Sequence, residues 1–169
     1  MQDHIQLTQK EINDEILAGV LGMPKWWLGA VTFLTLVVFT DYQCPFCRQM
    51  HPRLTALAME DGNVRIVFKD WAIFGQPSIE AARRALAAKY QGKDQAFDDA
   101  LMQIQGKLSS EKIRAAADQA GVDWQRLESD LKSHGKEIDA ALARADRQAG
   151  MLGISGTPAM FFGPYLVAG

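Results

Sequence analysis

The pattern of hydrophobic and polar positions changes character after residue 75. Before it, residues 31–40 carry no charge and are rich in β-branched and aromatic side chains, which is typical of a strand buried on both faces. Residues 64–68 begin with alternating character and follow the turn sequence Asp61-Gly62-Asn63, so they predict a second strand. We expect a helix between them that ends near Ala58. This order predicts a βαβ unit with parallel strands.

From residue 78 to residue 152 the apolar residues instead recur at helical spacing, in five successive stripes. Glycines separate the stripes and suit the left-handed position just past a helix end: Gly92, Gly106, Gly121 and Gly135. Ser109 or Ser110, and Asp123, are suited to cap the helices that follow them. We therefore expect residues 76–137 to be entirely helical, with one more helix over 136–152.

Both ends of the chain carry further predicted elements. Residues 159–162 and 165–168 are apolar and flank a glycine–proline turn, which predicts a hairpin. Residues 1–24 predict an amphipathic helix that opens with a capping box of Thr8 and Glu11. An apolar stripe alone does not name its partner, so this arm either packs against the domain or joins two copies in a homodimer.

Length and charge narrow the classes of function. The 169 residues suit one domain, or one domain with an insertion. There are 18 basic and 20 acidic residues, and no segment concentrates lysine and arginine, so nucleic-acid binding has no electrostatic support. Residues 26–40 are uncharged but shorter than a membrane span, and we interpret them as buried strand. The first 15 residues mix acidic and basic side chains, which does not fit a secretory signal.

The only two cysteines, Cys44 and Cys47, stand in a C-x-x-C motif between the first strand and its helix. At the first turn of a helix, unpaired N–H groups and the positive end of the dipole favour a thiolate, so Cys44 is the candidate nucleophile. We expect its side chain to be exposed and largely ionised at neutral pH. Cys47 lies deeper on the same helical face, within reach of a disulfide, and should keep a higher pKa as the resolving thiol. Pro45 suits the first turn because it has no N–H to leave unpaired.

A metal site is the alternative reading of the cysteine pair. A structural zinc ion needs four ligands as a rule, and only three histidines are available to supplement the cysteines. His51 does follow Cys47 by four residues on the same predicted helix. A C-x-x-C motif between a strand and a helix nevertheless favours redox chemistry, so we predict no metal.

Three stretches of the chain resemble the DsbA-like thiol:disulfide oxidoreductases, a branch of the thioredoxin superfamily. The first is F-T-D-Y-Q-C-P-F-C-R-Q-M-H-P, residues 39–52, which looks like the family's active site. The second is F-K-D-W-A-I-F-G followed by S-I-E-A-A-R-R-A-L, which looks like the entry into the family's inserted helical domain. The third, residues 153–162, resembles the cis-proline loop, with Thr157 before Pro158.

The resemblance implies an α/β class with a thioredoxin-like fold. Residues 25–75 and 138–169 would form the thioredoxin-like domain, residues 76–137 the inserted helical domain, and residues 1–24 an N-terminal arm. The family continues into a final helix, which we expect to be missing here. A carboxylate that relatives bury six residues before the first cysteine is replaced by Val38, and Asp41 and Lys69 are the nearest substitutes, unless both are solvated.

The resemblance also implies a function. Cys44 would attack or release a partner sulfur, and Cys47 would resolve the mixed disulfide without a cofactor. Pro45, Phe46, Thr157 and Pro158 would contact the substrate. The partners would be protein thiols and disulfides and a redox protein that resets the dithiol, in the periplasm or another extracytoplasmic setting. We expect an oxidase or isomerase rather than a reductase, and a mild oxidant, because Phe46 offers neither charge nor hydrogen bond.

Two functions of other classes stay open at this point. One is a non-catalytic holdase or metal carrier on the same fold, with the cysteines incidental. The other is a glutathione-linked transferase, although a single nucleophile would suffice for that chemistry.

Overall fold

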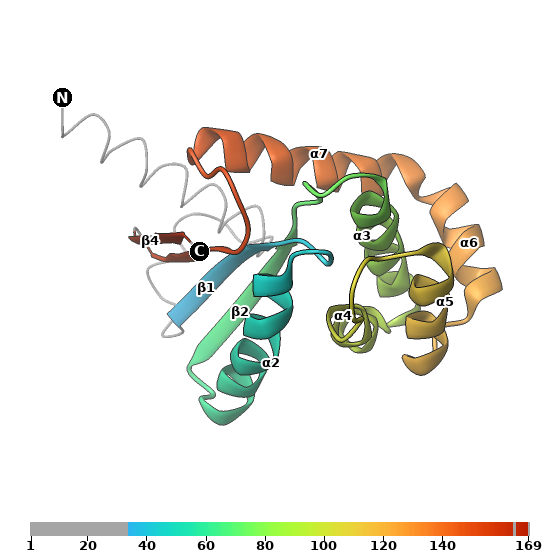
Figure 1. Ribbon diagram of the computed structural model, residues 1–169, viewed down its shortest axis with the longest axis horizontal. Coiled ribbons are helices and arrows are strands. Elements are labelled where there is room, and N and C mark those ends of the chain that lie inside the picture. Colours follow the sequence, from blue (N-terminus) through green and yellow to red (C-terminus); the bar gives the residue numbers. More distant parts are fainter. Residues whose placement is uncertain (1–33, 164, 169) are drawn as a thin grey trace.

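The computed structural model describes residues 34–163 and 165–168 (Figure 1). The predicted N-terminal arm, with Trp26 and Trp27 after it, lies outside this range. The described chain opens with strand β1 (Leu34–Thr40), helix α2 (Pro45–Glu60) and strand β2 (Val64–Asp70). β1 and β2 pair in parallel along their whole length, from Leu34 opposite Val64 to Thr40 opposite Asp70. The predicted βαβ unit is therefore confirmed.

Between Gln76 and Ser133 every regular element is a helix, as predicted. The elements are α3 (Gln76–Ala88), the 3-10 turn η2 (Lys89–Gln91), α4 (Asp94–Met102), α5 (Ser110–Gln119) and α6 (Trp124–Ser133). Ser109, rather than Ser110, caps α5 by accepting a hydrogen bond from the backbone N–H of Lys112, and Asp123 caps α6 in the same way. Gly92 ends η2 with a φ of 65°, the left-handed conformation that glycine adopts without a steric penalty.

The chain then returns to the sheet. Helix α7 (Gly135–Met151) leads to strands β3 (Ala159–Phe162) and β4 (Tyr165–Ala168), which form the predicted hairpin. β3 pairs antiparallel with β1, so the strand order is β2-β1-β3-β4 and β1 is an inner strand. The uncharged character of β1 follows from this position, because both of its edges and both of its faces are covered.

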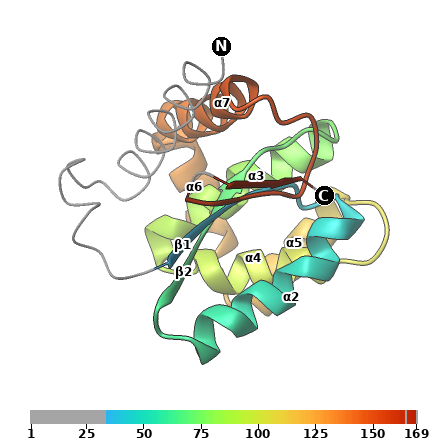
Figure 2. The ribbon, with the colours of Figure 1, turned by 90° about the vertical axis from the view of Figure 1, so that its left-hand side faces the viewer.

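One helix covers each face of the sheet, α2 on one side and α7 on the other (Figure 2). Leu36 and Val38 of β1 pack with Leu54 of α2, whereas Val37 and Phe39 pack with Ala149 of α7. Alternate residues of one strand thus supply two separate apolar layers, which is the period-2 geometry of a β-strand.

A third apolar core lies between the helices beside the sheet, and the active-site turn reaches into it. The buried residues of α3, α4, α5 and α6 form one cluster that also contains Tyr42, Cys44 and Cys47. The two cysteines therefore sit where the sheet part of the molecule meets the helical part, which Figure 1 shows to the right of the sheet.

Candidate active site

The cysteines stand at the point where α2 begins. Cys44 has an extended backbone, with φ −72° and ψ 119°, and Pro45 is the first helical residue. The N–H of Arg48 donates to the Cys44 carbonyl, which closes the first turn around Cys47. The first N–H groups of a helix have no partners within it, so α2 directs its positive end toward these side chains. The sequence prediction for the placement of Cys44 is confirmed.

The loop before β3 lies against the first cysteine. The Thr157–Pro158 peptide bond is cis, as predicted. The Cys44 thiol donates a hydrogen bond to the Thr157 carbonyl oxygen, with 3.3 Å between sulfur and oxygen. These residues are far apart in sequence and meet because β3 runs antiparallel beside β1, which brings the start of β3 to the end of β1.

The predicted exposure of Cys44 is wrong. Both cysteines are free thiols, and each is 1% exposed. Cys44 is covered on one side by the Thr157 backbone and packs on the other with Tyr42 and Cys47. The exposed surface belongs instead to Pro45 and Phe46, the latter 65% exposed.

Burial also decides the chemistry of Cys47. It raises the pKa of this thiol to about 11, because a thiolate loses its hydration there, while a hydrogen bond to the Thr40 side chain acts in the opposite direction. Cys47 thus keeps its proton at neutral pH, as predicted for the resolving thiol.

Asp41 is buried, so the alternative that its carboxylate is solvated is wrong. Its carboxylate accepts hydrogen bonds from the backbone N–H groups of Gln43 at 2.7 Å, Ile73 at 2.8 Å and Phe74 at 3.1 Å. It also accepts one from the Ser78 hydroxyl at 2.7 Å. These donors come from the active-site turn, the loop after β2 and helix α3, so Asp41 fixes three segments to one another.

Lys69 cannot take the place of the missing carboxylate. Its amine hydrogen-bonds to Gln148 of α7, on the face of the sheet opposite α2 and Cys47. Burial lowers the Lys69 pKa to about 8, with a smaller contribution from the charge of Arg144. Val38, at the position of the expected carboxylate, is fully buried in the apolar layer below α2.

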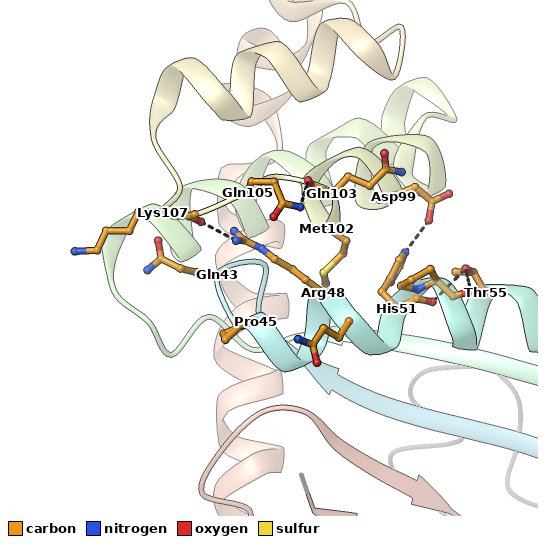
Figure 3. Close-up of a pocket in the computed structure, with 13 residues that line it drawn as sticks. Gln43, Pro45, Arg48, His51, Thr55, Asp99, Met102, Gln103, Gln105 and Lys107 are labelled. Atoms are coloured by element: carbon orange, nitrogen blue, oxygen red, sulfur yellow. Dashed lines mark hydrogen bonds and ion pairs between the residues drawn. The ribbon is translucent and has the colours of Figure 1, made fainter.

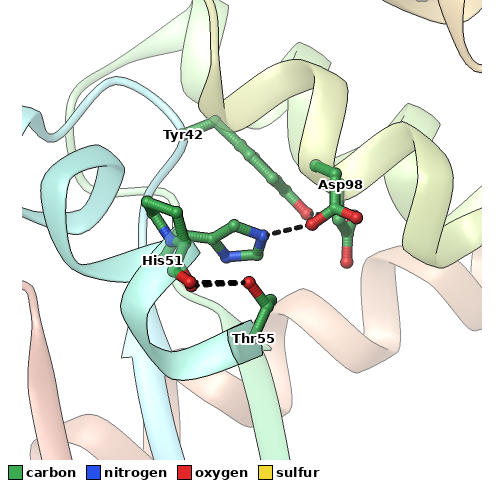
Figure 4. Close-up of polar contacts among 6 residues, drawn as sticks. Tyr42, His51, Thr55 and Asp98 are labelled. Atoms are coloured by element: carbon green, nitrogen blue, oxygen red, sulfur yellow. Dashed lines mark hydrogen bonds and ion pairs between the residues drawn. The ribbon is translucent and has the colours of Figure 1, made fainter. Parts of the chain in front are cut away.

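The sequence reasoning missed a cluster of acidic groups on the other side of the turn. The Tyr42 hydroxyl donates to the Asp98 carboxylate at 2.6 Å (Figure 4). Burial raises the pKa of Asp70 to about 7 and the pKa of Asp98 well above its usual range. The charge of Asp70 raises the pKa of Asp98 further, and burial together with both carboxylates raises the pKa of Tyr42. Asp98 follows the buried Phe97 on α4, and no local sequence pattern relates it to the active-site turn.

His51 has a structural partner close to that cluster. Its Nε2 lies 2.7 Å from the Asp99 carboxylate, and its ring lies on Phe68 of β2, with 4.8 Å between ring centroids. His51 therefore joins α2 to α4 and to the sheet.

Within residues 34–163 and 165–168, no three His, Cys, Asp or Glu side chains are grouped so that they could hold a metal ion.

A groove of about 910 Å³ opens beside the cysteines, between α2 and residues 102–107 (Figure 3). Arg48 crosses its floor, where Nε donates to the Tyr42 carbonyl and one terminal nitrogen donates to the Gly106 carbonyl, both at 2.7 Å. Gln43 accepts from the Leu108 N–H and donates to the Phe74 carbonyl, both at 3.1 Å. We call this space the α2–α4 groove.

The arrangement can support thiol chemistry that begins at Cys44, while Cys47 keeps its proton. Cys44 stands at the helix start beside an exposed Pro45–Phe46 surface, and Cys47 stands one turn deeper as a protonated thiol. A partner sulfur that reaches Cys44 must approach past the Thr157–Pro158 loop.

Comparison with known proteins agrees with this geometry. The sequence model of the DSBA-like thioredoxin domain family matches residues 35–169. A thioredoxin-like oxidoreductase from Silicibacter pomeroyi is 39% identical, with a TM-score of 0.76 over 80% of this chain and 78% of that one. The thiol-disulfide exchange protein alpha-DsbA2 from Wolbachia pipientis has a TM-score of 0.80 at 22% identity, over 98% and 90% of the two chains, and shares the fold.

Two further matches bear on location and length. A periplasmic thioredoxin-like protein from Salmonella enterica serovar Typhimurium is 29% identical, with a TM-score of 0.67 over 80% of this chain and 75% of that one. The curated relatives include a Na⁺/H⁺ antiporter NhaA 1 of Salinispora arenicola, 27% identical over 133 residues and 76% of this chain. The chain spans about a fifth of the length of these curated relatives. None of the helices among the described residues has the length and apolar character that a membrane span requires.

Proposed function

We propose that this chain exchanges disulfides with protein thiols through Cys44 and Cys47, because it belongs to the family of DSBA-like thioredoxin domains. The observation that carries the proposal is the contact at the start of α2, where the Cys44 thiol lies 3.3 Å from the Thr157 carbonyl of the cis-proline loop. This contact places a cysteine at a helix N-terminus beside backbone that an extended partner segment can pair with.

The reaction needs no group beyond the two thiols and the partner's sulfurs. When the dithiol is reduced, the Cys44 thiolate attacks one sulfur of a partner disulfide, and the other sulfur leaves as a thiolate. Cys47 then loses its proton and attacks Cys44, which releases the second partner thiol and leaves a Cys44–Cys47 disulfide. The reverse sequence oxidises a partner dithiol and reduces the Cys44–Cys47 pair. The raised pKa of Cys47 favours the first step at Cys44.

Four residues around Cys44 are proposed to contact the partner. Pro45 and Phe46 form the exposed surface beside the nucleophile. Thr157 and Pro158 are buried, and their loop forms the wall on the opposite side of the sulfur. A partner cysteine held between these surfaces would meet Cys44 with little rearrangement.

We further propose that residues 76–137 act as an inserted helical domain between two segments of a thioredoxin-like domain. The similarity to a periplasmic protein supports an extracytoplasmic location, where a second redox protein would reset the dithiol. We infer an oxidase or isomerase. A homodimer through residues 1–24 stays a prediction outside the described residues.

A redox titration of the Cys44/Cys47 pair in glutathione buffers tests the direction of electron flow. A potential between about −120 and −180 mV would support an oxidase or isomerase, and one near about −270 mV would identify a reductase. Insulin reduction with dithiothreitol tests the chemistry itself. Activity that survives the replacement of Cys44 by Ser would contradict disulfide exchange and favour a non-catalytic holdase.

A further inference from the structure

The α2–α4 groove begins next to the nucleophile, at Pro45, and runs along α2 as far as Thr55. Its volume of about 910 Å³ is large enough for several residues of an extended peptide, since sites for small ligands span about 300–1,000 Å³. A partner segment joined to Cys44 through its own cysteine would therefore meet this groove with its neighbouring residues.

Arg48 supplies a fixed cation at the cysteine end of the groove. Its Nε and one terminal nitrogen are held by backbone carbonyls, whereas the other terminal nitrogen is buried and has no hydrogen-bond partner among the described residues. Burial lowers the Arg48 pKa, and the negative charges of Asp41 and a Cys44 thiolate act against that change. Arginine nevertheless stays protonated in proteins, so a residue that lines this end of the groove holds a buried charged donor without a partner in the described part of the chain.

Lys107 adds a second cation on the opposite lip. Its side chain is exposed and makes no hydrogen bond or ion pair within the part of the chain that the structure describes. The nearby Lys112 differs, because its amine is held by the carbonyls of Gln105 and Lys107. Figure 3 shows Arg48 reaching from α2 toward the segment that carries Gln105 and Lys107.

The remaining lining, among the described residues, places no acidic side chain at this end of the groove. Asp99 is the one acidic residue that lines it in the described structure, and this carboxylate lies at the far end and is already paired with His51. Side-chain amides complete the walls: Gln43, Gln49, Gln103 and Gln105. Amides and cations together suit a carboxylate, which accepts several hydrogen bonds at once.

We propose that the α2–α4 groove binds the partner segment next to its reactive cysteine, and that it selects segments with an acidic side chain there. The inference rests on the proposed disulfide exchange and adds a substrate class to it. Arg48 and Lys107 would hold the carboxylate, while Cys44 exchanges with the neighbouring sulfur.

Three matched peptides test this inference on the full chain. Each contains one cysteine as an aryl disulfide, flanked on both sides by Glu, Gln or Lys. Attack by Cys44 forms the protein–peptide disulfide and releases one coloured arylthiolate, so the rate is read directly. We expect the Glu peptide to react about 10-fold faster than the Gln peptide at low salt, because complementary charge accelerates association, and the ratio to approach 1 in 1 M salt.

Two variants with the same change in net charge test whether the groove causes the preference for the Glu peptide. Lys107→Glu should abolish the advantage of the Glu peptide or give it to the Lys peptide. Lys132→Glu, an exposed residue of α6, should keep the wild-type ratio. A Glu peptide in which Ser replaces the cysteine should bind the wild type in calorimetry several-fold more tightly than it binds Lys107→Glu.

The outcomes separate the inference from the proposed function. Equal rates for the Glu and Gln peptides with the wild type would overturn the acidic preference while disulfide exchange stands. An equal loss of preference in Lys107→Glu and Lys132→Glu would overturn the role of the groove, because overall charge would then explain the preference. If no peptide reacts, disulfide exchange fails and the inference falls with it.

Discussion

The sheet part and the helical part of the molecule both hold the active-site turn, but they hold it differently. On the sheet side the contacts are buried and mostly reach backbone, as with Cys44 on the Thr157 carbonyl and Asp41 on the N–H groups of Ile73 and Phe74. On the helical side, pairs of side chains carry part of the contacts, as between Tyr42 and Asp98 or His51 and Asp99, beside the backbone contacts of Arg48 and Gln43.

This difference separates the contacts that fix the reactive sulfur from the contacts that pH and substitutions can alter. Backbone contacts do not depend on which side chains a neighbouring segment carries, so the sheet side fixes the position of the sulfur. Contacts between side chains depend on the charge state and identity of both residues, so the helical side is the one where pH and sequence can alter the site. The following predictions begin on the sheet side and end at a residue that bridges the two parts.

The largest effect is expected on the sheet side, at the cysteines themselves. Cys47→Ser should leave a nucleophile that cannot be resolved, so mixed disulfides with partner proteins accumulate, whereas Cys44→Ser should abolish capture. Non-reducing gels after mixing with unfolded, reduced or oxidised proteins provide the measurement. Better trapping by Cys44→Ser than by Cys47→Ser would reverse the assigned roles.

The next largest effect is expected at Asp41. Asp41→Ala would leave three N–H groups and the Ser78 hydroxyl without their acceptor. The free energy of unfolding in urea should fall by about 2–4 kcal/mol, the range for losing a charged acceptor with several donors. Asp99→Ala, at a partly exposed carboxylate, is the matched control and should cost less than half as much. Equal losses would mean that Asp41 does not organise the turn.

A moderate effect is expected from pH at Asp70, where the end of β2 meets the helical side. The pKa of Asp70 rises from its ordinary 3.8 to about 7 on folding, so the folded state binds the proton more tightly. The contribution of Asp70 to stability is thus complete below about pH 4 and is lost as the pH rises through about 7. Tyr42, Asp98 and Asp41 are the groups that interact with it, and Asp98 titrates in the same direction.

Urea unfolding at pH 5 and pH 8 measures this dependence. We expect the wild type to lose about 1–2 kcal/mol between these values, discounted for the partial exposure of Asp70. Asp70→Asn replaces the titrating carboxyl with an amide and should reduce the difference, whereas Asp118→Asn on the surface of α5 should not. An unchanged difference in Asp70→Asn would exclude this carboxyl as its source.

The smallest effect is expected at Gln43, which bridges the two parts. Its amide joins the Phe74 carbonyl to the Leu108 N–H; the first bond is exposed and the second is partly buried. Gln43→Ala should lower the free energy of unfolding by about 1 kcal/mol, and hydrogen exchange at Leu108 should accelerate. Gln105→Ala, whose amide bonds only to Gln103 nearby, is the control. Unchanged exchange at Leu108 would show that other contacts hold this loop.

The sequence predicted the fold well where the signal is local. Strand composition identified β1 and β2, glycine spacing and helical stripes identified the helices up to α7, and the turn before residue 165 identified the β3–β4 hairpin. The C-x-x-C motif and the resemblance around Thr157 also predicted that these two segments lie side by side, and they do so in the structure.

The errors arose where burial depends on distant segments. Cys44 was expected to be exposed because a helix start is often exposed, but the Thr157 loop covers it from the far end of the chain. Asp41 and Lys69 could not be told apart by position, since their surroundings come from the loop after β2 and from α7 respectively. The partners of Tyr42 and His51 lie on α4, which no local pattern relates to the active-site turn.

The place of β1 in the sheet has a consequence for the chain as it is synthesised. β1, α2 and β2 leave the ribosome before the helical part, but the second neighbour of β1 is β3, which follows the helical part. The helices in between form from local contacts, and this shortens the loop that must close when β3 docks. Thr157 stands just before β3 and arrives with it. During translation, therefore, Cys44 is made before the helical part and receives the backbone that covers it in the folded protein only after α7 has emerged.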